Sequence, residues 1–485
     1  MERYSPFSKE VGYVYRPEIR NYCREIPFDP PERYPELPFI TRINRENKIY
    51  PMIRTLFEQI GMDKENIGTS RWNPFRTLVK PGSNVLIKPN LVTHNHYLGE
   101  KALYGSIIHG SFIRPIIDYV YLALNGKGSI IIADNPIEAA DFTSLMEFTG
   151  IYSMIERLRK DGYDSLKVID LRPKVLREDK NGEFYYGDLP GDPLGYASID
   201  LGKNSLFSAF DLNPLVHYYT LSDMSVDHFD PKYSSESATD KYHNKRSHSY
   251  LVSGSVLNAD VVISVAKMKT HCKAGVTLTL KNIIGAVYQK DCMPHHRPGL
   301  PPLGDAFPQL PSPYFVFSRR FYHKLQRLGL VNFVFNFRNF KNYFQKKRKS
   351  LNQPIEHGNW KGNDTIWRTI LDLNRIVLYA DKKGIMRDSI QRNYFALLDG
   401  IIAQQGEGPK DGEPLTASII FGGFNPVLVD ALAVKSMGID YHLIKSISRA
   451  GEIEKWRLFP DNSVDLSFSN YSIPAFAFKL PKGWS

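Results

Sequence analysis

The chain has 485 residues, of which 42% are hydrophobic and 23% are charged, a composition typical of an ordered globular protein. Its three cysteines, Cys23, Cys272 and Cys292, are too few and too widely spaced for a disulfide framework or a four-thiolate cluster. The first residues contain no apolar signal core, and no run of about 18 apolar residues that could span a bilayer occurs. We therefore expect a cytoplasmic protein.

The positive charge is concentrated in one segment. The net charge is +11 at pH 7, and residues 306–355 contain ten Lys or Arg residues and no acidic residue. The rest of the chain is therefore close to neutral. This distribution argues against a general nucleic-acid-binding surface and directs the question of partners to the basic segment.

The first part of the chain differs in composition from the rest. Residues 1–75 are rich in proline and tyrosine and contain one predicted helix, at 48–61, so we interpret them as an N-terminal extension. From residue 84 onward, β-branched strands alternate with helical patterns. In chain order we predict strand 85–92, helix 112–124, strand 129–134, helix 144–160, strand 166–171, strand 260–271, helix 364–381, strands 394–400 and 416–423, and helix 426–437.

This alternation predicts an α/β fold with a mostly parallel sheet and helices on both faces. We assign residues 76–450 to one large elaborated domain, interrupted by the basic segment 306–355, and residues 451–485 to a C-terminal tail. The polar stretch 172–250 is expected to be irregular and to lie above the sheet. Ligands of such sheets bind beyond the carboxyl ends of the strands, so we expect the site there.

Polar residues follow the ends of five predicted strands. In a parallel sheet these ends meet at one edge, where converging ionisable groups make a candidate ligand site. Each residue could instead cap a helix or complete a loop. The residues are Lys88 and Asn90, Asp134, the segment Lys267–His271, Asp399, and Gly422 and Gly423 followed by Asp430.

The strongest local pattern is KMKTHCKAGVTLTLKN at residues 267–282. Side chains alternate in an extended chain, so Lys267, Lys269 and His271 would share one face, together with Lys273. Burial of like charges is costly unless an anion or solvent compensates them. Because the preceding strand is too apolar for a solvated edge, we predict a bound anion.

His271 is predicted to act as a general acid or base, because imidazole titrates near neutral pH and neighbouring cations favour its neutral form. A structural histidine is the alternative. Lys267 and Lys269 would act with it on the substrate, whereas Cys272 would face the other way and pack as a thiol, a reactive thiolate being the alternative. Further residues predicted to bind substrate are Lys88, Asn90, Asp134, Thr277, Lys281 and Asn282, with Gly406 and Gly408 offering backbone N–H groups from the turn GEGP.

Two groups of residues could hold a metal ion. The acidic trio Asp399, Glu407 and Asp430 suits Mg²⁺ shared with a phosphate or, alternatively, salt bridges to the lysines. The second group is Asp291, Cys292, His295 and His296. Neither group has the spacing of a structural zinc site.

In combination these motifs resemble the DUF362 family, over about residues 80–440. Some members of that family carry ferredoxin-like cysteine clusters, but this sequence has no CxxC motif, so we expect no iron–sulfur cluster. The resemblance names no reaction. The motifs are IKPN with Lys88–Asn90, KMKTH at Lys267–His271, TxxLKNxxG at Thr277–Gly285, DGI at Asp399–Ile401, GEGP at Gly406–Pro409, and NPVLVDA at Asn425–Ala431, where Asn425 replaces the usual Asp.

We therefore expect an enzyme that acts on a small phosphorylated or carboxylated substrate. Lys267, Lys269 and Lys281 would bind its anionic group, and Lys88 and Asn90 would orient it. The alternative is a non-catalytic protein that binds an anionic cofactor or a pathway intermediate.

The basic segment suggests a second partner. Eleven aromatic residues and ten cations alternate at 314–349, and apolar residues recur at helical spacing from Phe317 to Leu328. This layout is typical of a helix in a membrane interface, which would make the protein peripheral to an anionic membrane surface. The alternatives are packing on the protein's own sheet, RNA binding, a lid over the site, and a subunit interface.

Overall fold

A computed structural model describes residues 5–179, 184–211, 239, 241–297, 299–309, 355, 357–459, 465–469 and 471–484. The membrane-interface prediction for 314–349 lies outside these residues. Within them, one helical stretch, Glu100–Leu124, is long and apolar enough to cross a membrane, and 89% of its apolar window is buried inside the protein, as in the core helix of a globular fold.

The described part of the chain is organised around one mixed sheet of eight strands, in the order β1-β13-β12-β10-β2-β3-β4, with β11 paired to the end of β10. The five strands β12, β10, β2, β3 and β4 run parallel to one another, whereas β13 is antiparallel to both of its neighbours, β12 and β1. The predicted α/β fold with a mostly parallel sheet is thus confirmed. The strands are β1 (Val11–Tyr15), β2 (Asn84–Pro89), β3 (Ser129–Asp134), β4 (Leu166–Asp170), β10 (Val261–His271), β11 (Gly275–Thr277), β12 (Asn393–Gln405) and β13 (Glu413–Gly423).

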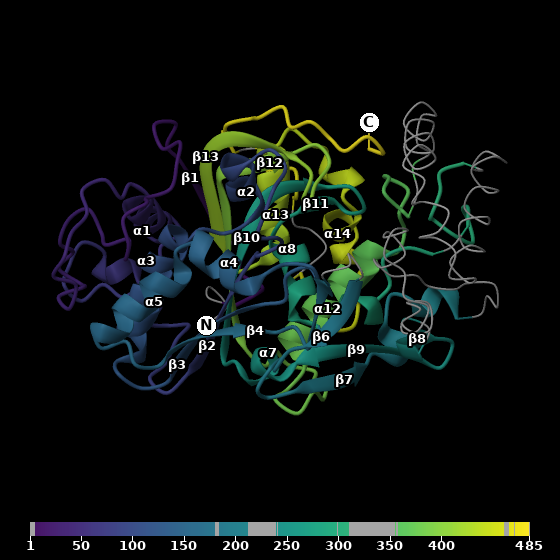
Figure 1. Ribbon diagram of the computed structural model, residues 1–485, viewed down its shortest axis with the longest axis horizontal. Coiled ribbons are helices and arrows are strands. Elements are labelled where there is room, and N and C mark those ends of the chain that lie inside the picture. The colour runs from purple at the N-terminus through teal and green to yellow at the C-terminus, as the bar shows by residue number, and fades with distance from the viewer. Residues whose placement is uncertain are drawn as a thin grey trace.

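Helices cover both faces of the sheet (Figure 1). Their apolar sides form two hydrophobic cores, one on each face, and this is why all residues of the central strand β10 are buried. On one face lie α1 (Ile49–Gln59), α2 (Glu100–Ser106), α3 (Gly110–Leu124), α4 (Phe142–Phe148) and α5 (Ile151–Lys160); on the other lie α7 (Gly254–Asn258), α8 (Thr279–Asn282), α12 (Ile366–Tyr379), α13 (Pro426–Ser436) and α14 (Lys445–Ser448).

Two sequence predictions about these elements were wrong. The helix predicted at 144–160 is two helices, because Gly150 adopts a left-handed backbone with φ 71° between them. The stretch 172–250, predicted to be irregular, contains a two-stranded and a three-stranded sheet in its described residues. Their strands are β5 (Lys174–Glu178), β6 (Phe184–Asp188), β7 (Tyr196–Asp200), β8 (His243–Asn244) and β9 (Ser247–Ser253).

The N-terminal segment is joined closely to the main sheet. Its strand β1 pairs with β13, from Val11 opposite Gly423 to Tyr15 opposite Ile419. Its helix α1 packs on α3 with six of its residues buried, among them Leu56 and Phe57. The segment therefore places side chains next to the central strands, which matters for the site.

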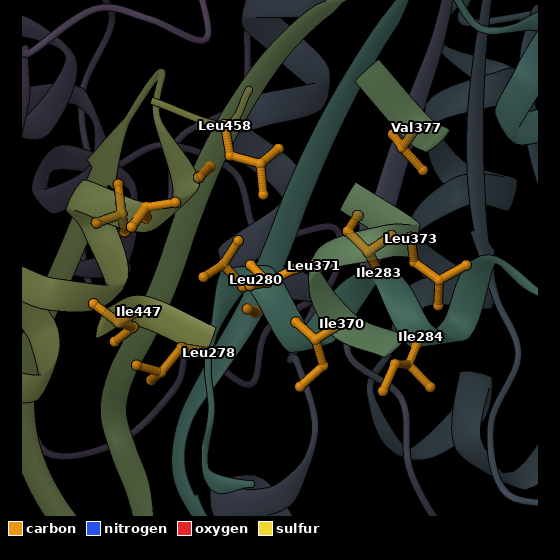
Figure 2. Close-up of a cluster of buried hydrophobic side chains, with 14 of the residues drawn as sticks. Leu278, Leu280, Ile283, Ile284, Ile370, Leu371, Leu373, Val377, Ile447 and Leu458 are labelled. Carbon is orange, nitrogen blue, oxygen red and sulfur yellow. The ribbon is translucent and has the colours of Figure 1, made fainter. Parts of the chain in front are cut away.

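The segment that follows β11 is held by its apolar residues. Figure 2 shows Leu280, Ile283 and Ile284 beside Ile370 and the neighbouring residues of α12, all of them buried. Lys281 and Asn282 stand between these anchored residues in the sequence. Their backbone is fixed in position because its neighbours on both sides are buried in the core.

Candidate functional site

Lys267 of β10 belongs to a buried ion pair with Asp399 of β12. The two residues are opposite each other in the sheet, and Lys267 Nζ lies 2.9 Å from Asp399 Oδ2. The hydroxyl of Tyr22 accepts from Lys267 at 2.7 Å and lies 2.7 and 2.8 Å from the two Asp399 oxygens. Burial lowers the pKa of Lys267, and Asp399 opposes that shift. The Lys267 ammonium is thus engaged within the protein, and not directed at a substrate as the sequence had suggested.

Lys88 and Asp134 form a second buried pair, at the ends of β2 and β3. Lys88 Nζ lies 2.6 Å from Asp134 Oδ1, and the two side chains are 1% and 3% exposed. The Asp134 carboxylate also accepts from the amides of Leu91 (2.7 Å) and Asn135 (2.8 Å). Asn282 donates to the Lys88 carbonyl at 2.9 Å. Three of the predicted substrate ligands therefore hold the loops after β2 and β3 together.

This pair explains the glycine at the end of the motif TxxLKNxxG. A Cβ at Gly285 would lie 2.1 Å from Asp134 Oδ1 and 2.6 Å from Lys88 Nζ. No side chain fits at that distance, so the close approach of this turn to the ion pair requires glycine.

Lys269 has a different environment, without a carboxylate. It lies opposite Thr277 of β11 and Gln404 of β12, and its Nζ donates to the carbonyl of Ser106 in α2 at 2.7 Å. Burial lowers the pKa of Lys269 well below its ordinary value, and Lys281 and Lys267 lower it further. The Thr277 hydroxyl, Gln404 Oε1 and, at the end of β2, the side-chain oxygen of Asn90 are buried without a hydrogen-bond partner.

His271 is held in one tautomer. Its Nδ1 accepts from the backbone amides of Lys273 (3.0 Å) and Ala274 (3.3 Å). A neutral ring with an acceptor at Nδ1 carries its proton on Nε2. Burial lowers the pKa of His271 well below its ordinary value, and Lys281, Lys273 and Lys269 add to the effect. His271 is therefore a neutral hydrogen-bond donor through Nε2, a geometry that does not suit the predicted general base.

Lys281 makes no side-chain hydrogen bond or ion pair with any residue that the structure describes, and the residue as a whole is partly exposed. Burial lowers the pKa of Lys281 to about 7; Cys272 opposes this shift, and Lys290, Lys273 and Lys88 add to it. Lys290, which no sequence motif had indicated, donates to the carbonyls of Asn135 (2.9 Å) and Pro136 (2.6 Å).

These cations form one group, which we call the lysine cluster because each lowers the pKa of at least one other member or of His271. Lys273 donates to the carbonyl of His357. Burial lowers the pKa of His295 well below its ordinary value, and Lys273 and Lys281 lower it further, so His295 lies beside the cluster. The lysine cluster consists of Lys88, Lys267, Lys269, Lys273, Lys281 and Lys290.

The acidic trio predicted to bind a metal does not come together. Asp399 pairs with Lys267, which was the stated alternative to metal binding. Asp430 accepts from the amides of Thr279 (2.8 Å) and Leu280 (3.0 Å) at the start of α8, and burial raises its pKa to about 7. Glu407 is exposed and accepts from the Lys482 amide. Among the described residues, no three His, Cys, Asp or Glu side chains are grouped closely enough to hold a metal ion.

Strand direction explains part of this result. The prediction assumed that the strand before Asp430 was parallel to the others, but β13 is antiparallel, with Gly423 opposite Ala396 of β12. The carboxyl end of β13, with Gly422 and Gly423, therefore lies away from the end of β10 that carries Lys269.

The glycines of the GEGP turn have a packing role. The Gly406 amide donates to the Lys479 carbonyl and the Gly408 amide to the Gly406 carbonyl, both at 2.8 Å, so neither is directed at an anion. The Gly408 carbonyl accepts from the Cys272 amide at 3.0 Å, and a Cβ at Gly408 would lie 2.0 Å from the Thr270 carbonyl oxygen. The turn thus fastens β12 and β13 to the end of β10.

The family described as Domain of unknown function (DUF362) matches residues 180–435. This range contains the lysine-rich strand β10, α8 and the GEGP turn, whereas Lys88 and Asp134 precede it. No curated protein and no solved structure matches the chain.

Proposed function

This chain belongs to the DUF362 family, and we propose that, within this family of unknown function, it is an enzyme that binds a small phosphorylated or carboxylated substrate beside Lys269. The proposal rests on one observation, the unequal pairing of the lysine cluster. Lys88 and Lys267 are paired with carboxylates, but Lys269, Lys281 and Lys290 have no carboxylate within ion-pair distance in the described part of the chain.

The physical argument is the cost of burying charge. A buried ammonium without a counter-ion is destabilised, and its pKa falls until it loses its proton. Lys269 and Lys281 both have lowered pKa values for this reason. An anion bound beside Lys269 would restore the charged form of that amine and would recover the interaction energy that the unliganded protein lacks.

Neutral donors support the same ligand. The Nε2–H of His271 would donate one hydrogen bond to such a ligand, and the buried Thr277 hydroxyl, which has no partner, would supply a second. Asn90 and Gln404 have buried oxygens without partners, and these accept hydrogen bonds. A substrate with hydroxyl or amide groups beside its anionic group would satisfy both kinds of side chain.

Thermal unfolding with added anions tests the proposal. We expect sulfate, phosphate and citrate to raise the melting temperature of the parent protein, since a ligand at 100 times its Kd stabilises by about 2.7 kcal/mol. Lys269→Met should lose this stabilisation. The matched control is Lys382→Met, because Lys382 is an exposed lysine that pairs with Asp260 at 2.8 Å. Equal stabilisation of both variants and the parent would refute the proposal.

A second measurement separates an enzyme from a binding protein. Native mass spectrometry of the purified protein detects any ligand that remains bound. An empty site supports turnover, and a ligand retained at full occupancy supports the non-catalytic alternative.

A further inference from the structure

Resting on the proposed anion site, we propose that Lys281 is a nucleophile that forms an imine with an aldehyde or ketone carrying a phosphate or carboxylate group. The substrate would then be a carbonyl compound with an anionic group, and imine formation would be the first chemical step at the site. Lys269 and the neutral donors beside it would bind the anionic group.

The hydrogen-bond pattern distinguishes Lys281 from the other members of the cluster. Lys88 and Lys267 donate to carboxylates, and Lys269, Lys273 and Lys290 donate to backbone carbonyls. In the part of the chain that the structure describes, the amine of Lys281 has no such acceptor, and the residue is partly exposed. A free amine among immobilised ones is the arrangement that a reaction with a carbonyl compound requires.

The backbone of Lys281 is fixed although its amine is free. Leu280 and Ile283 anchor the segment on α12 (Figure 2), and the Asp430 carboxylate accepts from the Thr279 and Leu280 amides. An amine on a rigid backbone with a bound anion nearby meets the carbonyl carbon in a restricted geometry, and this restriction accelerates the reaction.

The electrostatics keep the amine in its reactive form. An amine attacks a carbonyl only when it is unprotonated, and burial beside other cations favours that form. The pKa of Lys281 is lowered from 10.5 to about 7. At pH 7 its unprotonated fraction is therefore about a thousand times that of an exposed lysine.

The step balances without a further reagent. The Lys281 nitrogen forms a bond to the carbonyl carbon as the carbon–oxygen double bond becomes single, and one of the two amine protons moves to that oxygen, which gives a carbinolamine. Loss of this hydroxyl together with the remaining amine proton, as water, leaves the imine. Protonation of the imine then makes it an electron acceptor for the bonds at the adjacent carbon.

Reductive trapping tests the inference on the full-length protein. Pyridoxal 5′-phosphate, a phosphorylated aldehyde, is added below one equivalent at pH 7 and reduced with sodium borohydride, and the modified peptide is identified by mass spectrometry. We expect at least tenfold more label on Lys281 than on the exposed Lys382. Excess inorganic phosphate should lower the label, and pyridoxal, which lacks the phosphate, should give much less.

The variant Lys281→Arg keeps the charge but removes the nucleophile. It should lose the label on this peptide while sulfate still raises its melting temperature, which also shows that it is folded. Label spread over surface lysines, or labelling of the parent and the variant to the same extent, overturns the inference. If sulfate stabilises the parent but Lys281 is not labelled, only the imine step fails. If no anion stabilises the parent, the anion site itself fails.

Discussion

Replacing Asp134 with Asn should strongly destabilise the protein, because Asp134 is the only carboxylate paired with buried Lys88 among the described residues. In the variant Asp134→Asn, Lys88 keeps only two contacts of 3.3 Å, to the Pro89 carbonyl and to Asn282 Oδ1. Breaking one partner of a buried ion pair costs about 3–5 kcal/mol. The cost of removing the proton from the lysine sets an independent upper limit of similar size for this loss of stability. Neutralising a lysine with an ordinary pKa of 10.5 at pH 7 costs about 5 kcal/mol, at about 1.36 kcal/mol for each pKa unit.

Urea unfolding at pH 7 measures this loss, and the double variant Lys88→Met with Asp134→Asn isolates its cause. Removing the lysine charge as well should recover most of the stability, leaving about 1–3 kcal/mol for a backbone amide that loses its acceptor. If the double variant is as unstable as Asp134→Asn, the loss comes from the amides and the reasoning about charge is refuted.

The pH dependence of Asp134→Asn has a definite sign. A lysine that is neutral in the folded protein and protonated in the unfolded chain makes the unfolded state bind more protons. The stability of this variant should therefore rise as the pH is raised from 7 toward 10.5, the ordinary pKa of lysine. Urea unfolding across that range, with the parent as control, checks the sign, and a stability that falls relative to the parent would contradict it.

Three further predictions concern the neighbouring residues. Lys269→Met should raise the stability of the unliganded protein by about 1–4 kcal/mol in urea unfolding, since it removes a buried amine without a counter-ion; a loss of stability would contradict this environment. Gly285→Ala should cost about 3–5 kcal/mol because its Cβ would separate the buried pair of β2 and β3, whereas the control Gly451→Ala, with no atom within 4 Å of its Cβ, should cost less than about 1 kcal/mol. Sulfate affinity, measured by calorimetry, should fall as the pH rises above about 7, because Lys281 loses its proton there. The variant Lys281→Arg should not show this fall in affinity near pH 7. If the variant has the same pH profile as the parent, Lys281 is not the group that causes the fall.

The sequence alone was sufficient for the fold class and for several elements of the main sheet. The runs that became β3, β10 and α13 were placed to within about one residue, because an apolar run or a helical period is a local property of the chain. A single helix was predicted at 144–160, where the structure has two, because the left-handed conformation of Gly150 between them leaves no periodic signal in the sequence.

The sequence also selected the region in which we propose the site. It selected β10 and the segment after it because lysines follow an apolar strand there, and the structure places Lys269 and His271 at that strand end, buried, with Lys281 nearby. The type of residue and its position after a strand are written in the sequence, so this part could be predicted.

Only the tertiary structure decided which of these lysines are already paired. Tyr22 reaches Lys267 across 245 residues, and no pattern near either residue indicates that contact. The antiparallel direction of β13 follows from long-range pairing with β12 and β1, and it separates Asp430 from the end that carries Lys269. The role of a charged side chain depends on its nearest counter-charge and on its access to water, and both are set by contacts between distant segments.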